Sequence, residues 1–135
     1  MAYADDEPSA FATMLGGLIE ANVSARPEKR ADFDRLHARV GILAKDAGEA
    51  ATLDFETGRL TVSSRLLDGR QLTITADSDT ILQLSNLKVG PLGMPVYFDE
   101  TGRSVVGKLL SGRLRIAGMQ RVGLLNRVTR IFSVV

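Results

Sequence analysis

The sequence predicts an α+β domain in which a five-stranded, mainly antiparallel sheet is covered on one face by helices and closed by a C-terminal amphipathic helix. Apolar residues recur at helical spacing near both ends of the chain and at a spacing of two between residues 40 and 74. With 135 residues, the chain fits one domain, since domains commonly have about 100 to 150 residues. We therefore expect a single domain over residues 1–135 with a flexible terminus at residues 1–8.

Two helices are predicted before the first strand. Ser9 is a suitable N-cap for a helix within residues 8–24, whose apolar side is formed by Phe11, Met14, Leu15, Leu18 and Ile19. A second, short helix begins near Pro27, because proline suits the first turn of a helix. Phe33 and Leu36 point inward from it, and its charged residues, Lys29 among them, are expected on the solvated side.

Four strands follow, because the apolar residues now alternate with polar ones. The inward pairs are Val40 and Ile42, Leu53 and Phe55, Leu60 and Val62, and Leu72 and Ile74. Thr57-Gly58 and Asp68-Gly69 predict tight hairpins, since glycine accepts the positive φ of such turns. The strands should therefore form an antiparallel meander. The other parity is polar and predicts a solvated face, with residues Thr52, Asp54, Thr61, Ser63, Thr73 and Thr75.

The last part of the chain predicts two more helices, a fifth strand and a closing helix. Asp77–Asp79 starts one helix and Asp99 caps another that runs to Ser111. Residues 113–117 alternate as a strand. In the final segment an apolar stripe is formed by Leu124, Leu125, Val128, Ile131, Phe132 and Val135, and Arg127 and Arg130 lie opposite it.

Composition excludes several kinds of chemistry. The chain has no cysteine and a single histidine, His37, so thiolate sites are absent and a metal site is not expected. Glycine-rich phosphate loops are missing, and no aromatic residues interleave with the arginines of residues 113–121. We therefore expect no metal, no cofactor, no nucleic-acid partner and no catalytic residue.

Charge and hydropathy predict a cytoplasmic protein. The N-terminal segment carries Asp5, Asp6 and Glu7 rather than the basic start of a secretory signal, and no run of about 18 apolar residues occurs. Residues 1–100 hold ten Lys or Arg against sixteen Asp or Glu, whereas residues 101–135 hold seven against none. This basic C-terminal segment predicts transient contact with an anionic membrane surface or with an enzyme of lipid metabolism.

The order of these elements resembles that of the sterol carrier protein type 2 domain family. The resemblance covers roughly residues 10–135, and its most specific part is LLSGRLRIAGMQRVGLLNRV at residues 109–128. The segment DSDTILQL, after a strand, is similar to the family's acidic start of an apolar helix. The resemblance implies a non-catalytic carrier that holds a fatty acyl chain, sterol or similar lipid in an internal tunnel between sheet and helices.

The expected ligand-binding residues come from the inward faces of the predicted elements. They are Leu15, Leu18, Ile81, Leu82, Leu110, Leu114, Ile116, Leu124, Leu125, Val128 and Phe132. Arg121 is added because it lies seven positions before Val128, close to the apolar stripe, where it can meet a carboxylate or hydroxyl of a ligand. For each apolar residue, ordinary core packing is the alternative.

Two other functions remain open at this point. A tyrosine and a carboxyl group in an apolar site are the working parts of ketosteroid isomerases, and Tyr97 and Asp99 offer such a pair. The order of elements disagrees with that family, and Asp99 is equally suited to cap a helix. In the other alternative, the chain is an interaction module that docks on a lipid-metabolism enzyme through Arg127 and Arg130.

Overall fold

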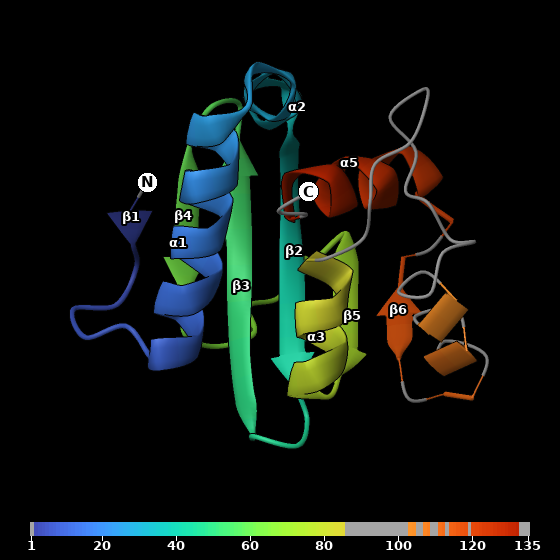
Figure 1. The fold of residues 1–135 in the computed structure, drawn as a ribbon. Coiled ribbons are helices and arrows are strands. Elements are labelled where there is room, and N and C mark those ends of the chain that lie inside the picture. The colour runs from blue at the N-terminus through green and yellow to red at the C-terminus, as the bar shows by residue number, and fades with distance from the viewer. Residues whose placement is uncertain are drawn as a thin grey trace.

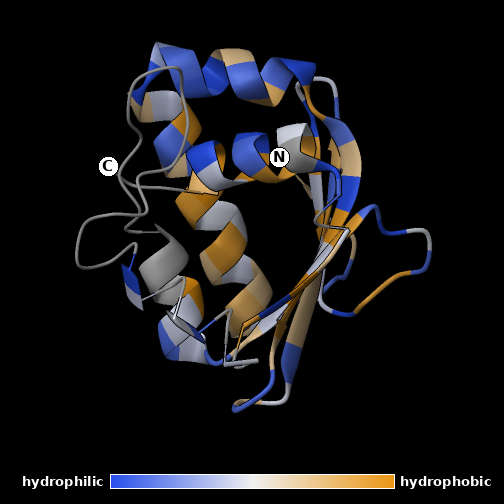
Figure 2. Ribbon diagram, turned by 90° about the vertical axis from the view of Figure 1, so that its right-hand side faces the viewer, coloured by the Kyte–Doolittle hydropathy of each residue, from blue (hydrophilic) through white to orange (hydrophobic). Residues whose placement is uncertain are grey.

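The computed structural model has a mixed sheet with a layer of helices on one side (Figures 1 and 2). It describes residues 2–85, 103–104, 107–108, 111–112, 114–118 and 120–132. The strands of the sheet are β1 (Ala2–Tyr3), β2 (His37–Ala44), β3 (Glu49–Glu56), β4 (Leu60–Ser63), β5 (Leu72–Ala76) and β6 (Arg115–Ala117). The helices are α1 (Ala10–Ala25), α2 (Pro27–Arg35), α3 (Ser78–Ser85) and α5 (Val122–Phe132).

The antiparallel strands β2, β3 and β4 are the part of the sheet that agrees best with the prediction from the sequence. Its longest ladder runs from the pair His37 and Glu56 to the pair Ala44 and Glu49. Thr57 and Gly58 connect β3 to β4 with φ angles of 45° and 89°, and the Glu56 N–H donates to the Arg59 carbonyl at 2.9 Å. Two consecutive positive φ angles define a tight hairpin whose twist matches that of the strands. The predicted hairpin at this position is confirmed.

The predicted hairpin at Asp68-Gly69 is wrong, because β5 does not return beside β4. The order of the sheet is β1-β4-β3-β2-β5-β6, and β5 pairs in parallel with β2. Residues 64–71 therefore connect two strands that are separated by β3 and β2, and Gly69, with a φ of 81°, lies within this longer connection. A turn pattern read locally cannot reveal which strand edge the chain joins next.

The connection of residues 64–71 also covers part of the sheet face that was expected to be solvated. Thr52, fully buried, donates through Oγ1 to the Arg65 carbonyl at 2.7 Å and accepts from the Leu67 N–H at 2.9 Å. Gly41 of β2 leaves the space that the side chains of Leu66 and Arg70 occupy, since a Cβ there would lie 2.5 Å from Arg70 Cδ. The helices lie on one face of the sheet as predicted, but this connection shields part of the other.

Six strands replace the five predicted, and the sheet is mixed rather than mainly antiparallel. The added strand, β1, comes from the residues expected to be flexible, and it pairs in parallel with β4. The Ala4 N–H donates to the Val62 carbonyl at 2.9 Å, and the Ser64 N–H donates to Asp5 Oδ2 at 2.7 Å. A two-residue strand has too few residues to show the alternation by which strands are predicted.

The core lies between the sheet and the helix layer, and the predicted inward residues of β2, β3, β4 and β5 are all buried there. The largest fully buried side chains include Phe55, Leu15, Ile19, Leu36, Ile42, Leu53, Leu72, Ile81, Leu114, Ile131 and Val40. Helix α5 lies across the helix side of the sheet (Figure 1) with Val128, Ile131 and Phe132 buried. The predicted closing helix is therefore confirmed over its described residues.

Two polar residues tie the helices together. Asn22 of α1 donates from Nδ2 to the carbonyls of Ile131 and Phe132, at 3.0 and 3.1 Å, and so satisfies carbonyls at the end of α5. Lys29 of α2 was expected on the solvated side but is 4% exposed, and this burial lowers its pKa. Lys29 is buried because α2 packs against both α1 and α5, so more than one side of this helix is covered by protein.

Candidate functional site

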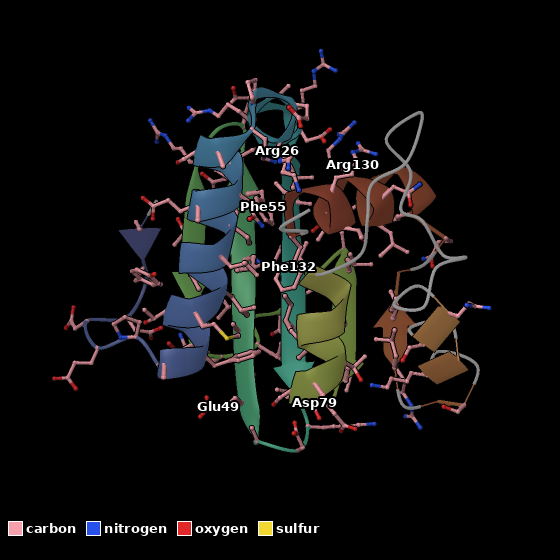
Figure 3. The ribbon with its side chains drawn as sticks, in the orientation of Figure 1. Arg26, Glu49, Phe55, Asp79, Arg130 and Phe132 are labelled. Carbon is pink, nitrogen blue, oxygen red and sulfur yellow. The ribbon has the colours of Figure 1, made fainter. Side chains whose placement is uncertain are left out.

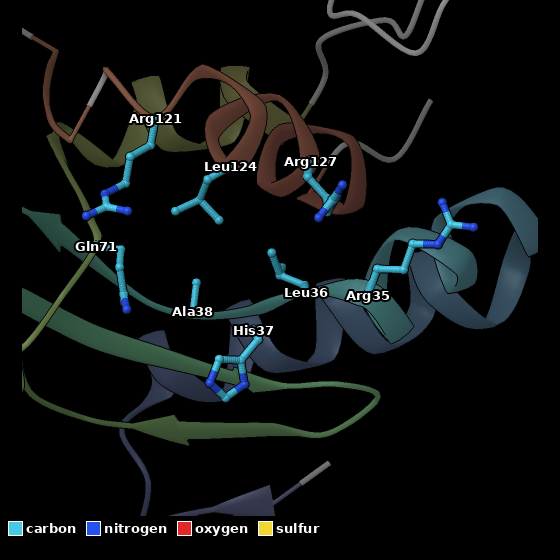
Figure 4. A pocket seen from close by; sticks show the side chains of 8 residues that line it. All are labelled: Arg35, Leu36, His37, Ala38, Gln71, Arg121, Leu124 and Arg127. Atoms are coloured by element: carbon cyan, nitrogen blue, oxygen red, sulfur yellow. The ribbon is translucent and has the colours of Figure 1, made fainter.

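An open pocket lies between α5 and the beginning of β2 (Figure 4). Its volume is about 310 Å³, close to the lower end of the roughly 300–1,000 Å³ that small-molecule sites span. It is lined by Arg35, Leu36, His37, Ala38, Gln71, Arg121, Leu124 and Arg127. These residues come from the end of α2, the start of β2, the residue before β5, and α5 with the residue before it.

The apolar part of the pocket faces inward. Leu124 reaches down from α5 toward Leu36 and Ala38, which point up from the start of β2 (Figure 4). Leu36 and Ala38 are buried, and Leu124 is partly buried against the core. The alternation of β2 places Ala38 toward the helices and sends the His37 ring away from α5 (Figure 4).

Gly118 brings Arg121 to the edge of the pocket. Its φ is 92°, and a Cβ at this position would overlap the Gln71 carbonyl oxygen. The turn after β6 can therefore approach the chain before β5 only if residue 118 is glycine. The Arg121 N–H donates to the Gly118 carbonyl at 2.9 Å, so this contact also fixes the start of α5.

Gln71 lies at the same end of the pocket as Arg121, on the facing wall (Figure 4). Its Oε1 accepts from the Arg39 N–H at 2.7 Å, and its own N–H donates to the Arg39 carbonyl at 2.9 Å. Because the oxygen of the amide is engaged with the backbone, the Nε2 hydrogens are directed elsewhere. The amide is therefore held as a donor next to the space under α5.

The electrostatics of the pocket favour an anion. Arg121 and Arg127 reach in from above (Figure 4), and none of the described lining residues is acidic. Asp32 is the nearby carboxylate, but Arg130 donates to both of its oxygens, at 2.8 and 2.9 Å, and these bonds raise the pKa of Arg130. Arg127 lies farther from Asp32, with Nε 3.9 Å from Oδ1. Within the described part of the chain, Arg121 makes no ion pair.

The structure places the expected ligand-binding residues in three groups. Arg121 and Leu124 line the pocket. Buried core positions are taken by Leu15, Ile81, Leu114, Val128 and Phe132, and partly buried ones against the core by Leu18, Ile116 and Leu125. The Leu82 side chain and all of Leu110 lie outside the described residues, as do Tyr97 and Asp99 of the alternative enzyme site.

Six lining residues were not anticipated as site residues, namely Arg35, Leu36, His37, Ala38, Gln71 and Arg127. Leu36 was correctly predicted to point inward, but nothing in its spacing indicates that it lies beside a pocket rather than in the core. No pattern in the sequence around Gln71 indicates that this residue lines a pocket. Its role depends on strand β5 joining β2, which local patterns do not reveal.

Neither a cluster of metal ligands nor a membrane-spanning helix is found among the described residues. Among them, no group of three or more histidine, aspartate or glutamate side chains is placed to hold a metal ion. None of their helices is both long and apolar enough to cross a bilayer.

This chain has the sterol carrier protein 2 fold, which it shares with several solved structures. A solved UbiJ-SCP2 structure, described as a ubiquinone synthesis protein, superposes with a TM-score of 0.62 at 13% identity, covering 90% of each chain. Sterol carrier protein 2 from Yarrowia lipolytica, in its apo form, gives a TM-score of 0.52 at 16% identity, covering 86% of this chain and 84% of that one.

A further sterol carrier protein 2 crystal structure gives a TM-score of 0.51 at 12% identity, covering 86% of this chain and 91% of that one. The predicted resemblance is confirmed at the level of the fold. No protein-family model matches the sequence. No curated protein matches it either.

Proposed function

We propose that this chain is a non-catalytic carrier that binds one lipid-like molecule with its apolar part beneath α5. The observation that carries the proposal is the pocket between α5 and β2, with Leu36, Ala38 and Leu124 as its apolar wall. The fold shared with sterol carrier protein 2 supports it. Transfer of each methylene from water to such a wall contributes about 0.8 kcal/mol, so about six methylenes contribute roughly 5 kcal/mol before the costs of binding.

The lining of the pocket favours binding over catalysis. His37 is the histidine in the described lining, and its ring points away from α5 (Figure 4). The described lining residues can hold and orient a ligand, and none of them carries a carboxyl group that could move its protons.

A lipid carrier must exchange its ligand with a membrane or another protein, and the charge distribution supports such contact. Figure 3 shows Arg130 at the α2 end of the molecule, where the pocket lies, and Glu49 and Asp79 at the opposite end. Arg35, Arg121 and Arg127 all line the pocket, and a cationic opening of this kind suits an anionic bilayer surface. Contact with an anionic membrane, in the cytoplasm, is part of the proposal.

The interaction-module alternative receives less support. It depended on Arg127 and Arg130 being available on the outer side of α5. Arg130 instead binds Asp32 of α2 through two hydrogen bonds, and Arg127 lines the pocket. These arginines therefore act within the chain.

Displacement of a fluorescent fatty acid from the purified protein tests the proposal, with native mass spectrometry to count bound ligands. Ubiquinone belongs among the competitors because one protein of the same fold is described as a ubiquinone synthesis protein. We expect one bound ligand per chain and competition by apolar molecules. Absence of any binding by both methods would refute the proposal.

A pair of matched variants locates the ligand. Leu124→Glu replaces part of the apolar wall with a carboxylate that can pair with Arg121 or Arg127, and it should weaken binding by more than about tenfold because the alkyl tail would then lie against a charged group. Met14→Glu makes the same kind of change on α1, at a side chain that is 41% exposed, and should leave binding unchanged. Equal binding by both variants would place the ligand elsewhere.

A further inference from the structure

We propose that the pocket selects amphiphiles with an anionic head group, which binds between Arg121 and Gln71 while the alkyl tail lies beneath α5. This inference rests on the proposed function, and it names the class of ligand that the site takes. An apolar wall alone would accept a neutral lipid equally well. The arrangement of donors at one end of the pocket makes the difference.

Arg121 supplies the charge at this end. It is exposed at the opening and, within the described residues, makes no ion pair that would neutralise it. It also directly precedes α5, where the helix dipole adds positive potential instead of offsetting the charge. A cation is unfavourable at this position unless an anion accompanies it, and a ligand head group placed there would satisfy both the guanidinium and the helix end.

Gln71 supplies neutral donors on the opposite wall. The bond from the Arg39 N–H to its Oε1, at 2.7 Å, fixes which end of the amide is free. The free Nε2 group can donate to a carboxylate or phosphate oxygen but cannot accept from a hydroxyl. Its bond to an oxyanion is charge-assisted and therefore stronger than its bond to an alcohol oxygen, so Gln71 adds to the preference that the charge of Arg121 creates.

The contact of Gly118 with the Gln71 backbone holds the two residues together. A side chain at residue 118 would overlap the Gln71 carbonyl, so the turn that carries Arg121 lies directly against the chain that carries Gln71. At the other end of the pocket, Arg127 lies 3.9 Å from Asp32, which offsets its charge. Arg121 and Gln71 therefore lie at one end of the pocket and Arg127 at the other, with Leu124 and Ala38 between them (Figure 4).

The test compares three amphiphiles with the same tail, namely dodecyl phosphate, dodecanoate and dodecanol, and adds inorganic phosphate without a tail. Binding is measured by competition and by calorimetry with the full chain near neutral pH. We expect the two anionic amphiphiles to bind about tenfold more tightly than dodecanol, which is the usual effect of a charge-assisted hydrogen bond. Inorganic phosphate should bind far more weakly than dodecyl phosphate because it buries no methylenes.

Two variants assign this preference to the residues. Arg121→Gln should weaken the anionic amphiphiles about five- to tenfold and leave dodecanol within about twofold. Gln71→Glu keeps an oxygen for the Arg39 N–H but replaces the free donor with an anionic oxygen, so it should abolish the preference for anions. Arg65→Gln removes one exposed arginine in the connection after β4 and should change nothing.

The outcomes separate this inference from the proposed function. If dodecanol binds as tightly as dodecyl phosphate, or if Arg121→Gln weakens all three amphiphiles equally, head-group selection is refuted and the carrier proposal stands. If inorganic phosphate binds as tightly as dodecyl phosphate, the site is a plain anion site and the inference is likewise refuted. If no amphiphile binds, the proposed function itself fails.

Discussion

Replacement of Gly118 by alanine should destabilise the protein and disturb the candidate site at the same time. The residue has a φ of 92°, and a Cβ would overlap the Gln71 carbonyl oxygen. The left-handed conformation costs an alanine about 1 to 2 kcal/mol. Removal of the overlap requires the turn or the neighbouring strand to move, and such overpacking typically costs about 1 to 3 kcal/mol more. We therefore expect a total loss of about 2 to 5 kcal/mol.

Gly112 provides the matched control for this prediction. Its φ is 80°, yet nothing lies within 4 Å of a Cβ built at that position. Gly112→Ala should therefore carry only the conformational cost of about 1 to 2 kcal/mol. The difference between the two variants isolates the contact between the turn and Gln71.

Urea unfolding followed by circular dichroism measures both stabilities, and calorimetry measures ligand binding. Gly118→Ala should also weaken the preference for an anionic head group, because the displaced turn carries Arg121 away from Gln71. If Gly118→Ala and Gly112→Ala lose equal stability, the close approach is not a constraint on the folded chain. The account of how Arg121 is positioned would then be wrong.

Two further predictions concern side chains that connect separate elements. Asn22→Leu keeps a similar side-chain volume but leaves the Ile131 and Phe132 carbonyls without their donor. We therefore expect the free energy of unfolding, measured in urea, to fall by about 2 to 4 kcal/mol. A variant as stable as the wild type would show that these bonds contribute nothing. Asp46 accepts hydrogen bonds from the Ser78 N–H and hydroxyl, and these bonds lower the pKa of its carboxyl group. Its contribution to the stability of the fold is therefore present above about pH 4 and is lost as the pH falls through the lowered pKa. Thermal unfolding of Asp46→Asn should show a shallower loss of stability below about pH 4 than the wild type; identical slopes would contradict this assignment.

The local elements were predictable because each has a pattern within a few residues of itself. Ser9 caps α1 through a bond from the Ala12 N–H, and Pro27 begins α2, as the sequence indicates. The stripe of α5 also follows from spacing alone, since only a helix brings residues three and four apart onto one side. The hairpin at Thr57 and Gly58 follows from the positive φ that glycine accepts.

The candidate site was predictable only in part. Arg121 and Leu124 follow from their position beside the apolar stripe of the last helix, and both line the pocket. Gln71 and Ala38 had no such signal, because their proximity to α5 is set by which strands pair and not by their neighbours in sequence. The bond between Arg130 and Asp32 joins residues 98 positions apart and has no local pattern either.

The amino-acid order by itself determined helices α1, α2, α3 and α5, the inward residues of strands β2 to β5, and the apolar side of the closing helix. These depend on backbone preferences and on the separation of apolar side chains from water, both of which act over a few residues. Only the tertiary structure decided that β5 joins β2 in parallel, that β1 extends the sheet beside β4, and that Gly118 presses against Gln71. Long-range pairing minimises unpaired backbone and empty volume over the whole molecule, so no single segment specifies it.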